Sequence, residues 1–507
     1  MKEKLHPVMF AGTGSDVGKS VIATAFCRIF KQDGYSPAPF KAQNMALNSF
    51  ATPEGLEIGR AQAVQAEAAG IPCHTDMNPL LLKPQSDHTS QVVLNGKPVG
   101  NRDAYDYFRK EGREELRSAV CEAFDRLAAR YNPIVMEGAG SLAEINLRDS
   151  DLVNVPMAIH AGADIILVGD IDRGGVFASV YGSVMLLPPE ERKYIKGIII
   201  NKFRGDMRLF EEGRKMLEEL CGVPVLGVVP YVKDIHIEEE DSVALAAKSA
   251  AAERGKVNIA VVLLRHISNF TDFDSLERDP RVHLFYSDNP AEISKADIVI
   301  LPGSKSTLDD LYWLRRGGVA QAILRARREG ATVLGICGGY QMMGRMILDP
   351  HNIEGEIGSM PGLALLPTVT EMLPGKVTRQ VEFRLSKGAA ALSPGLEGIS
   401  GPMEGYEIHM GTTTPAEDAA ASPLNIISGG AEDGFMVDAK CMGTYIHGIL
   451  DNPSFVDFLL APHAEKLSGS AEAFDYHAFK EEQYDKLAAH VRKYVDVPLL
   501  YKILKGE

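Results

Sequence analysis

The sequence predicts an α/β fold of two domains, each with helices on both faces of a parallel sheet in three layers. Three observations predict it. The chain has 507 residues, which is more than a single hydrophobic core usually supports. Short β-branched runs alternate with helical stretches in two separate series. A small, polar stretch at residues 246–256 separates the two series, and this composition is typical of a linker between domains.

The first series predicts a domain over residues 1–245. Its strands are predicted at Val8 to Ala11, Ile134 to Met136, Ile165 to Val168, Ile198 to Ile200 and Val225 to Val229. Residues 102–131 carry apolar side chains at mixed three- and four-residue spacings, which predicts one amphipathic helix or two in succession.

The second series predicts a domain over residues 257–507. Its strands are predicted at Ile259 to Leu264, Ile298 to Leu301, Thr332 to Ile336 and Met442 to Ile446. Residues from about 471 onward are expected to form helices that complete this second domain.

Composition excludes several classes of protein. The formal net charge is −15, so the chain lacks the broad basic surface that binds a nucleic-acid backbone. The six cysteines form no CxxC pair, which argues against a zinc site or a disulfide framework. No apolar run approaches membrane-spanning length. We therefore expect a soluble, cytoplasmic protein without membrane or nucleic-acid partners.

The strongest motif of the first domain is a glycine loop between a strand and a helix. Its members are Gly12, Thr13, Gly14, Ser15, Asp16, Val17, Gly18, Lys19 and Ser20. A strand, glycine loop and helix in this order direct backbone N–H groups at a phosphate, with Lys19 at the terminal phosphates of ATP and Ser20 on Mg²⁺. The loop has one residue more than the usual motif, and Thr13 stands where the ordinary pattern has glycine. An ordinary strand-to-helix turn is the alternative.

Three further residues are candidates for the same site. Glu137 follows a predicted strand, at the sheet edge where ligands bind in such folds, and is expected to hold Mg²⁺; a solvated acid in a glycine-rich turn is the alternative. Asn201 also ends a strand, and its amide has the donor and acceptor needed to bind adenine, unless it lies in a polar loop. Lys41 is expected to neutralise phosphate or a substrate carboxylate.

The second domain offers a thiol site. Cys337 stands between a buried strand pattern and a helix, in a turn of small residues that exposes its side chain. The backbone N–H of Gly338 and the turn at Gly303 are expected to bind an oxyanion. His447, which also follows a strand, is expected to act as the base. The alternatives are an inert buried thiol and a structural imidazole.

Glu407 and His409 alternate on one predicted strand and therefore share a face. They are expected to support glutamine binding or to orient His447. A cross-strand pair is the alternative.

These segments resemble known families. The sequence Leu334-Gly335-Ile336-Cys337-Gly338-Gly339 resembles the nucleophile turn of class I glutamine amidotransferases, which implies a flavodoxin-like second domain that releases ammonia from glutamine. Ordinary members have a glutamate two residues after the histidine, where this chain has Ile449. The longer glycine loop, and Lys41 after the second strand, resemble the P-loop-type ATP-binding domain of the dethiobiotin synthetase group.

Nearly the whole chain resembles the cobyric acid synthase family. The resemblance rests on both sites and on the segments 44–48, 76–79, 201–206 and 406–411. It implies ATP- and glutamine-dependent amidation of carboxylates b, d, e and g of a corrinoid, adenosylcobyrinic acid a,c-diamide, and a shielded path for ammonia between the domains. The alternatives are cobyrinic acid a,c-diamide synthase, another ATP-dependent glutamine amidotransferase, or a non-enzymatic P-loop ATP switch with a degenerate glutaminase module.

Overall fold

The computed structural model describes residues 2–84, 89–103, 113–238, 245, 248–392, 401–416, 422–467 and 473–507. It divides into two compact units. The first comprises Met1–Ala46, Leu56–Glu238 and Ala478–Glu507, and the second comprises Leu47–Gly55 and Glu239–His477. Both units are α/β, as the sequence predicts. Among the described residues, no helix combines the length and apolar character needed to cross a membrane.

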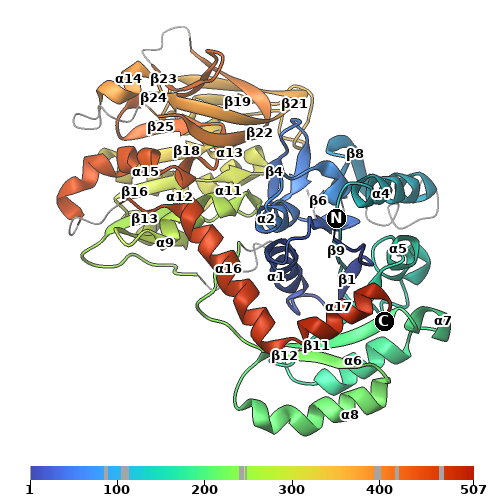
Figure 1. Ribbon diagram of the computed structural model, residues 1–507. Helices are drawn as coiled ribbons and strands as arrows, with labels where there is room; N and C mark the ends of the chain where they lie inside the picture. The colour runs from blue at the N-terminus through green and yellow to red at the C-terminus, as the bar shows by residue number, and fades with distance from the viewer. Residues whose placement is uncertain are drawn as a thin grey trace. The chain divides into compact units, whose positions relative to one another are not determined.

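The first unit is built on a six-stranded parallel sheet (Figure 1). In order across the sheet, its strands are β12 (Val225–Pro230), β11 (Ile195–Phe203), β10 (Asp164–Asp170), β1 (Val8–Gly12), β9 (Ile134–Glu137) and β2 (Ala38–Phe40). A second sheet contains β3 (Gln43–Met45), β6 (Leu80–Pro84), β7 (Thr89–Leu94) and β8 (Lys97–Asp103). The five strands predicted for this part of the chain all belong to the six-stranded sheet.

Helices cover both faces of the six-stranded sheet. Alternate strand residues such as Val8 and Phe10 share a core with helix α1 (Lys19–Gln32). On the other face, a Cβ at Gly169 would lie 2.9 Å from Val180 of α6 (Val176–Met185). Because side chains alternate between the faces of a strand, these contacts define three layers. The unit also contains α2 (Arg60–Ala69), α4 (Arg113–Ala128), α5 (Val155–Ala161), α7 (Pro189–Arg192) and α8 (Glu211–Cys221). Of the helix predicted over 102–131, residues 104–112 lie outside the described residues.

The C-terminal segment differs from its expected place in the second domain. Residues 478–507, the greater part of α16 (Tyr476–Tyr494) and all of α17 (Val497–Lys505), belong to the first unit. Leu487 and Val491 join the core that contains α1, and α17 packs beside β12 (Figure 1). A Cβ at Gly227 would lie only 2.3 Å from the carbonyl oxygen of Tyr494. The spacing of apolar residues in an amphipathic helix shows that one face is buried, but it does not show which of the two sheets that face covers.

The second unit is built on a twelve-stranded mixed sheet. Its parallel part has the order β15 (Val282–Ser287), β13 (Val257–Val262), β16 (Ile298–Leu301), β18 (Thr332–Ile336) and β25 (Cys441–Thr444). It continues into β24 (Glu432–Asp438), β23 (Ser422–Ile427), β21 (Thr368–Leu385), β19 (Met346–Leu348) and β20 (Ser359–Pro361); β22 (Met403–Pro415) pairs with β21 and with β26 (Ile446–His447). Helices α9 (Asp274–Arg278), α10 (Pro290–Ile293), α11 (Thr307–Arg316), α12 (Val319–Arg328), α13 (Gly338–Met343), α14 (Lys387–Ala391) and α15 (Pro453–Leu460) complete it.

One short segment of the N-terminal sequence belongs to this second unit. Residues 47–55, which include β4 (Ser49–Ala51), pack against β21 and β22. Asn48, Ser49, Ala51 and Thr52 are buried. The sequence analysis placed this segment in the first domain, because nothing in the local sequence of these residues indicates that their partners lie far along the chain.

Candidate active site

The predicted phosphate loop joins β1 to α1 in the first unit. Gly18, at the start of α1, has φ 93° and Asp16 has φ 58°, so both lie in left-handed backbone. A Cβ at Gly12 would lie 2.8 Å from the carbonyl oxygen of Gly14. The N–H of Thr13 donates to the carbonyl oxygen of Val168 on β10 at 3.0 Å. A tight loop that leads into a helix N-terminus is an arrangement that binds phosphate.

The side chain of Lys19 lies across this loop and is buried. Its ammonium donates to the carbonyl oxygen of Gly14 at 2.8 Å and to that of Gly140 at 3.1 Å. These bonds join the loop to the turn that follows β9. They hold a positive charge beside the loop, where phosphate oxygens would need it.

Glu137, the last residue of β9, is the centre of a buried polar cluster. Its Oε1 accepts hydrogen bonds from Ser20 Oγ at 2.8 Å and from Lys41 Nζ at 3.0 Å. Its Oε2 accepts a bond from Gln65 Nε2 at 2.7 Å. The structure therefore brings together three residues that the sequence predicted, and adds Gln65 of α2.

This cluster holds Glu137 as a carboxylate. Burial alone would raise the pKa of Glu137, but the charge of Lys41 and the hydrogen bonds from Gln65, Lys41 and Ser20 lower it below its ordinary value. Because the ionised form is favoured, the cluster presents an anionic oxygen next to the phosphate loop.

The residues fit Mg²⁺. Mg²⁺ takes oxygen ligands in a near-octahedral shell at about 2.0–2.1 Å, so two neighbouring ligand oxygens stand about 2.9 Å apart. Ser20 Oγ and Glu137 Oε1 are 2.8 Å apart. A hydroxyl at the start of α1 and a carboxylate at the end of β9 are thus spaced as two adjacent ligands would be.

Asn201, on β11, lies against the phosphate loop. Its Nδ2 donates to the carbonyl oxygen of Val17 at 2.9 Å, and a Cβ at Gly18 would lie 2.2 Å from that nitrogen. The neighbouring Lys202 pairs with Asp170 at 3.0 Å. The amide that we expected to bind adenine therefore fixes the loop backbone at the start of α1, and its contact with adenine stays a prediction.

In the second unit, Cys337 lies in a sharp turn between β18 and α13. Its backbone has φ 52° and ψ −112°, a conformation that costs free energy in a residue other than glycine. Its N–H donates to the carbonyl oxygen of Thr444 at 2.8 Å. A Cβ at Gly339 would lie 2.0 Å from the carbonyl oxygen of Leu301, so the turn packs closely against the end of β16 and requires glycine there.

His447, on β26, is the predicted base, and an aspartate holds its imidazole. Its Nδ1 bonds to Asp272 Oδ2 at 2.7 Å, and the N–H of Gly448 donates to Asp272 Oδ1 at 3.0 Å. Burial alone would lower the pKa of His447, but the charges of Asp272 and Cys337 and the bonds to them raise it to about 10. Because Nδ1 faces Asp272, Nε2 is the nitrogen left for the sulfur of Cys337. The structure thus forms a Cys-His-Asp group.

Two backbone segments adjoin this group. A Cβ at Gly303 would lie 3.3 Å from Cε1 of His447, and one at Gly338 would lie 2.9 Å from the backbone nitrogen of Ser304. Asp310 supports the turn by accepting a bond from Ser304 Oγ at 2.6 Å. The predicted oxyanion residues therefore lie beside the predicted nucleophile, Cys337, and the predicted base, His447.

Glu407 and His409 lie near His447 without a described hydrogen bond to it. Glu407 pairs with Arg379, its cross-strand neighbour on β21. His409 stacks on Tyr445 with 3.7 Å between ring centroids, and burial lowers the pKa of His409 to about 4. Asp272, which the sequence analysis did not identify, takes the orienting position. It lies in a short 3-10 turn (Phe270–Phe273) with no glycine motif or strand end to mark it.

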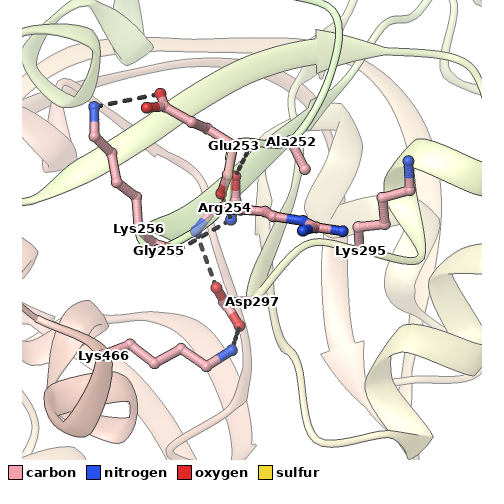
Figure 2. Close-up of a pocket in the computed structure, with 9 residues that line it drawn as sticks. Ala252, Glu253, Arg254, Gly255, Lys256, Lys295, Asp297 and Lys466 are labelled. Atoms are coloured by element: carbon pink, nitrogen blue, oxygen red, sulfur yellow. Dashed lines mark hydrogen bonds and ion pairs between the residues drawn. The ribbon is translucent and has the colours of Figure 1, made fainter.

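A separate cavity of about 590 Å³ lies in the second unit (Figure 2). It is lined by Ala252, Glu253, Arg254, Gly255, Lys256, Asn258, Lys295, Asp297 and Lys466. Asn258 and Asp297 stand at the amino ends of β13 and β16, whereas Cys337 follows the carboxyl end of β18. The cavity is therefore distinct from the thiol site.

Both parts of the chain match known family models. Residues 8–243 match the CobQ/CobB/MinD/ParA nucleotide binding domain. Residues 258–455 match the CobB/CobQ-like glutamine amidotransferase domain. A nucleotide loop in one unit and a cysteine group of the glutaminase type in the other define an ATP-dependent glutamine amidotransferase.

Relatives that match over the full length identify the family within the class of ATP-dependent glutamine amidotransferases. The cobyric acid synthase of Bacteroides fragilis is 74% identical over 504 residues, which are 99% of each chain. The cobyric acid synthases of Phocaeicola vulgatus and Parabacteroides distasonis are 69% and 59% identical, with both chains covered in full. The chain belongs to the cobyric acid synthase family. These relatives do not favour the diamide synthase or the non-enzymatic switch.

Proposed function

We propose that this protein amidates carboxylates b, d, e and g of adenosylcobyrinic acid a,c-diamide, with ATP and glutamine, to give adenosylcobyric acid. The observation that carries the proposal is the 74% identity to a cobyric acid synthase across 99% of both chains. Asp272 and His447, hydrogen-bonded at 2.7 Å beside Cys337, support the glutaminase part of the reaction.

In the glutaminase step, the sulfur of Cys337 attacks the side-chain amide carbon of glutamine. A protonated His447, stabilised by Asp272, favours the thiolate form of the sulfur. The developing oxyanion lies near the N–H of Gly338. The C–N bond breaks as His447 gives its proton to the departing ammonia, which leaves a thioester. Water, deprotonated by His447, then releases glutamate and the free cysteine.

In the ligase step, a substrate carboxylate attacks the γ-phosphorus of ATP, and ADP leaves. The ammonium groups of Lys19 and Lys41 offset the negative charge on the phosphates. Ser20 and Glu137 would hold Mg²⁺, which supplies charge neutralisation at the phosphates. Ammonia then attacks the acyl phosphate, and phosphate departs as the amide forms.

Ammonia must reach the acyl phosphate before solvent protonates it. A shielded path from Cys337 to the nucleotide site therefore stays a prediction of this proposal. To test for this path, a second enzyme that consumes free ammonia is added in excess. An unchanged rate of glutamine-dependent amidation would support the shielded path.

Mass spectrometry tests the substrate assignment. The protein is incubated with ATP, Mg²⁺, glutamine and the corrinoid a,c-diamide, and the product is examined for four successive exchanges of acid for amide. Four exchanges support the assignment. Glutamine hydrolysis without any exchange on this corrinoid would reject the substrate and leave the amidotransferase class intact.

A further inference from the structure

Residues 47–55, here called the docking segment, contact the turn that carries Asp272. The segment precedes β5 (Glu57–Gly59) in the chain but belongs to the second unit. Asn48 Oδ1 accepts a hydrogen bond from the N–H of Phe270 at 3.2 Å. In return, the N–H of Ser49 donates to Asn269 Oδ1 at 3.1 Å. These two bonds join the segment to Asn269 and Phe270 at the start of the turn, three and two positions before Asp272.

The turn itself begins in a costly conformation. Asn269 has φ 52°, in left-handed backbone, which asparagine tolerates better than most residues. Its side chain is satisfied on both sides, because Oδ1 accepts from Ser49 and Nδ2 donates to the hydroxyl of Tyr406 at 3.3 Å. Strained backbone of this kind persists when neighbouring contacts fix it. Here the docking segment supplies one of those contacts.

A second set of contacts reaches the histidine. The ring of Phe50 packs on Tyr406 with 4.5 Å between centroids. Tyr406 in turn stacks on His447 at 5.3 Å and an interplanar angle of 23°. Tyr406 and His447 are also direct partners in the pairing of β22 with β26. The three rings therefore form a continuous row of contacts, tilted at Phe50 and stacked at His447, from the docking segment to the imidazole of His447.

We propose that Asn48 and Phe50 are positioning residues of the glutaminase centre, which hold Asp272 and Tyr406 so that the imidazole of His447 faces Cys337. Asn48 acts through the backbone of the Phe270–Phe273 turn. Phe50 acts through the ring of Tyr406. The glutaminase unit is then incomplete without a segment that the sequence places only six residues after Lys41 of the nucleotide site. The inference rests on the proposed roles of Cys337 and His447.

The test uses the full-length variants Asn48→Ala and Phe50→Ala. Glutamine hydrolysis is measured as kcat and KM, and ammonia-supported amidation is measured in the same samples. A displacement of catalytic groups by a fraction of an ångström to an ångström costs about 10- to 100-fold in rate. We expect kcat for hydrolysis to fall by about that factor, with KM and ammonia-supported amidation within about 2-fold of the wild type.

Two control variants distinguish a misplaced imidazole of His447 from a general loss of structure. Glu54→Ala changes an exposed side chain of the same segment and should leave both activities unchanged. Phe50→Tyr keeps the ring and should restore hydrolysis toward the wild-type rate.

A pH profile gives a readout that a merely structural role would not change. Asp272, Cys337 and His409 act on His447 electrostatically, and the phenol ring of Tyr406 lies against its imidazole. If Asp272 moves away, the alkaline limit of hydrolysis shifts to lower pH in Asn48→Ala.

Unchanged kcat and an unchanged alkaline limit in both alanine variants would overturn the proposal, and so would an equal loss of hydrolysis and ammonia-supported amidation. A wild-type protein that does not hydrolyse glutamine would instead reject the proposed function on which the inference rests.

Discussion

Asp272 accepts a hydrogen bond from Nδ1 of His447 at 2.7 Å, and the side chains of both are almost completely buried, at 3% and 1% exposure. This pair replaces the glutamate that ordinary class I amidotransferases carry two residues after the histidine, where this chain has Ile449. Because the aspartate comes from a different part of the chain, the orienting acid is restored in space although it is missing from the local motif.

The variant Asp272→Asn should lose most of its glutaminase activity. The amide removes the negative charge that stabilises the imidazolium and disturbs the tautomer of His447, and the equivalent change in a serine triad costs about 10⁴-fold in kcat. We expect a loss of about 10²- to 10⁴-fold in kcat for glutamine hydrolysis, while ammonia-supported amidation persists. Asp288→Asn, an exposed site in the same unit, is the matched control. Hydrolysis within a few-fold of wild type in Asp272→Asn would contradict the assignment.

The ion pair between Asp272 and His447 should also affect how the free energy of unfolding depends on pH. The pKa of His447 is raised to about 10, above the ordinary value of about 6.5. The contribution of protonated His447 to the free energy of unfolding is therefore fully present below about pH 6.5 and is lost as the pH rises through about 10. In urea titrations, the free energy of unfolding should fall more between about pH 7 and pH 10 in the wild type than in Asp272→Asn. Equal falls in both proteins would show that the ion pair adds nothing.

The variant Lys41→Met should destabilise the first unit. The ion pair with Glu137 is buried, at 8% and 1% side-chain exposure, and removal of one partner from such a pair costs about 3–5 kcal/mol. Ammonia-supported amidation should also fall sharply, whereas glutamine hydrolysis should be retained. Chemical denaturation with a signal from the first unit measures the first effect. A variant as stable as the wild type would mean that Glu137 finds another partner or takes up a proton.

The variant Ser20→Ala tests the metal ligands. Loss of the hydroxyl removes one of two oxygens spaced for Mg²⁺. We expect the concentration of Mg²⁺ needed for half-maximal ATP-dependent amidation to rise, with glutamine hydrolysis unaffected. Chelation of the metal should abolish amidation in the wild type as well. An unchanged Mg²⁺ requirement in the variant would exclude Ser20 as a ligand.

The variant Gly339→Ala should impair the thiol site through the backbone. A methyl group there would lie 2.0 Å from the carbonyl oxygen of Leu301, so the turn that holds Cys337 must shift. We expect a large loss of glutaminase activity together with lower stability of the second unit. Gly401→Ala, where a Cβ meets no atom within 4 Å, is the control. An active and stable Gly339→Ala protein would contradict the close packing described here.

The sequence analysis identified the candidate site residues that lie close to the ends of predicted strands. Lys19 follows β1 across the glycine loop, Glu137 ends β9 and Cys337 follows β18. His447 comes three residues after the end of the parallel strand β25. The ligand edge of a parallel sheet can be inferred from the order of strands and helices. The cross-strand pairing of Glu407 with Arg379 depends on register in an antiparallel region that periodicity alone did not define.

Contacts between distant segments were not predictable in the same way. Asp272 lies in a 3-10 turn without a motif, Gln65 lies on a helix of small residues, and residues 47–55 find their partners in the second unit. The C-terminal helix has an apolar face that suits either sheet, and its place was decided by packing on α1. The local sequence pattern predicts whether a segment forms a helix or a strand. The segment against which it packs depends on the whole fold.

The central claim is that Cys337 releases the nitrogen that appears in the product amides. Glutamine labelled with ¹⁵N in its side-chain amide, supplied with ATP, Mg²⁺ and the corrinoid a,c-diamide, tests this claim most directly by mass spectrometry of the product. We predict label in every new amide with the wild type, none with Cys337→Ala, and label in both proteins when ¹⁵N-ammonium replaces glutamine. Label transferred from glutamine by Cys337→Ala would contradict the account.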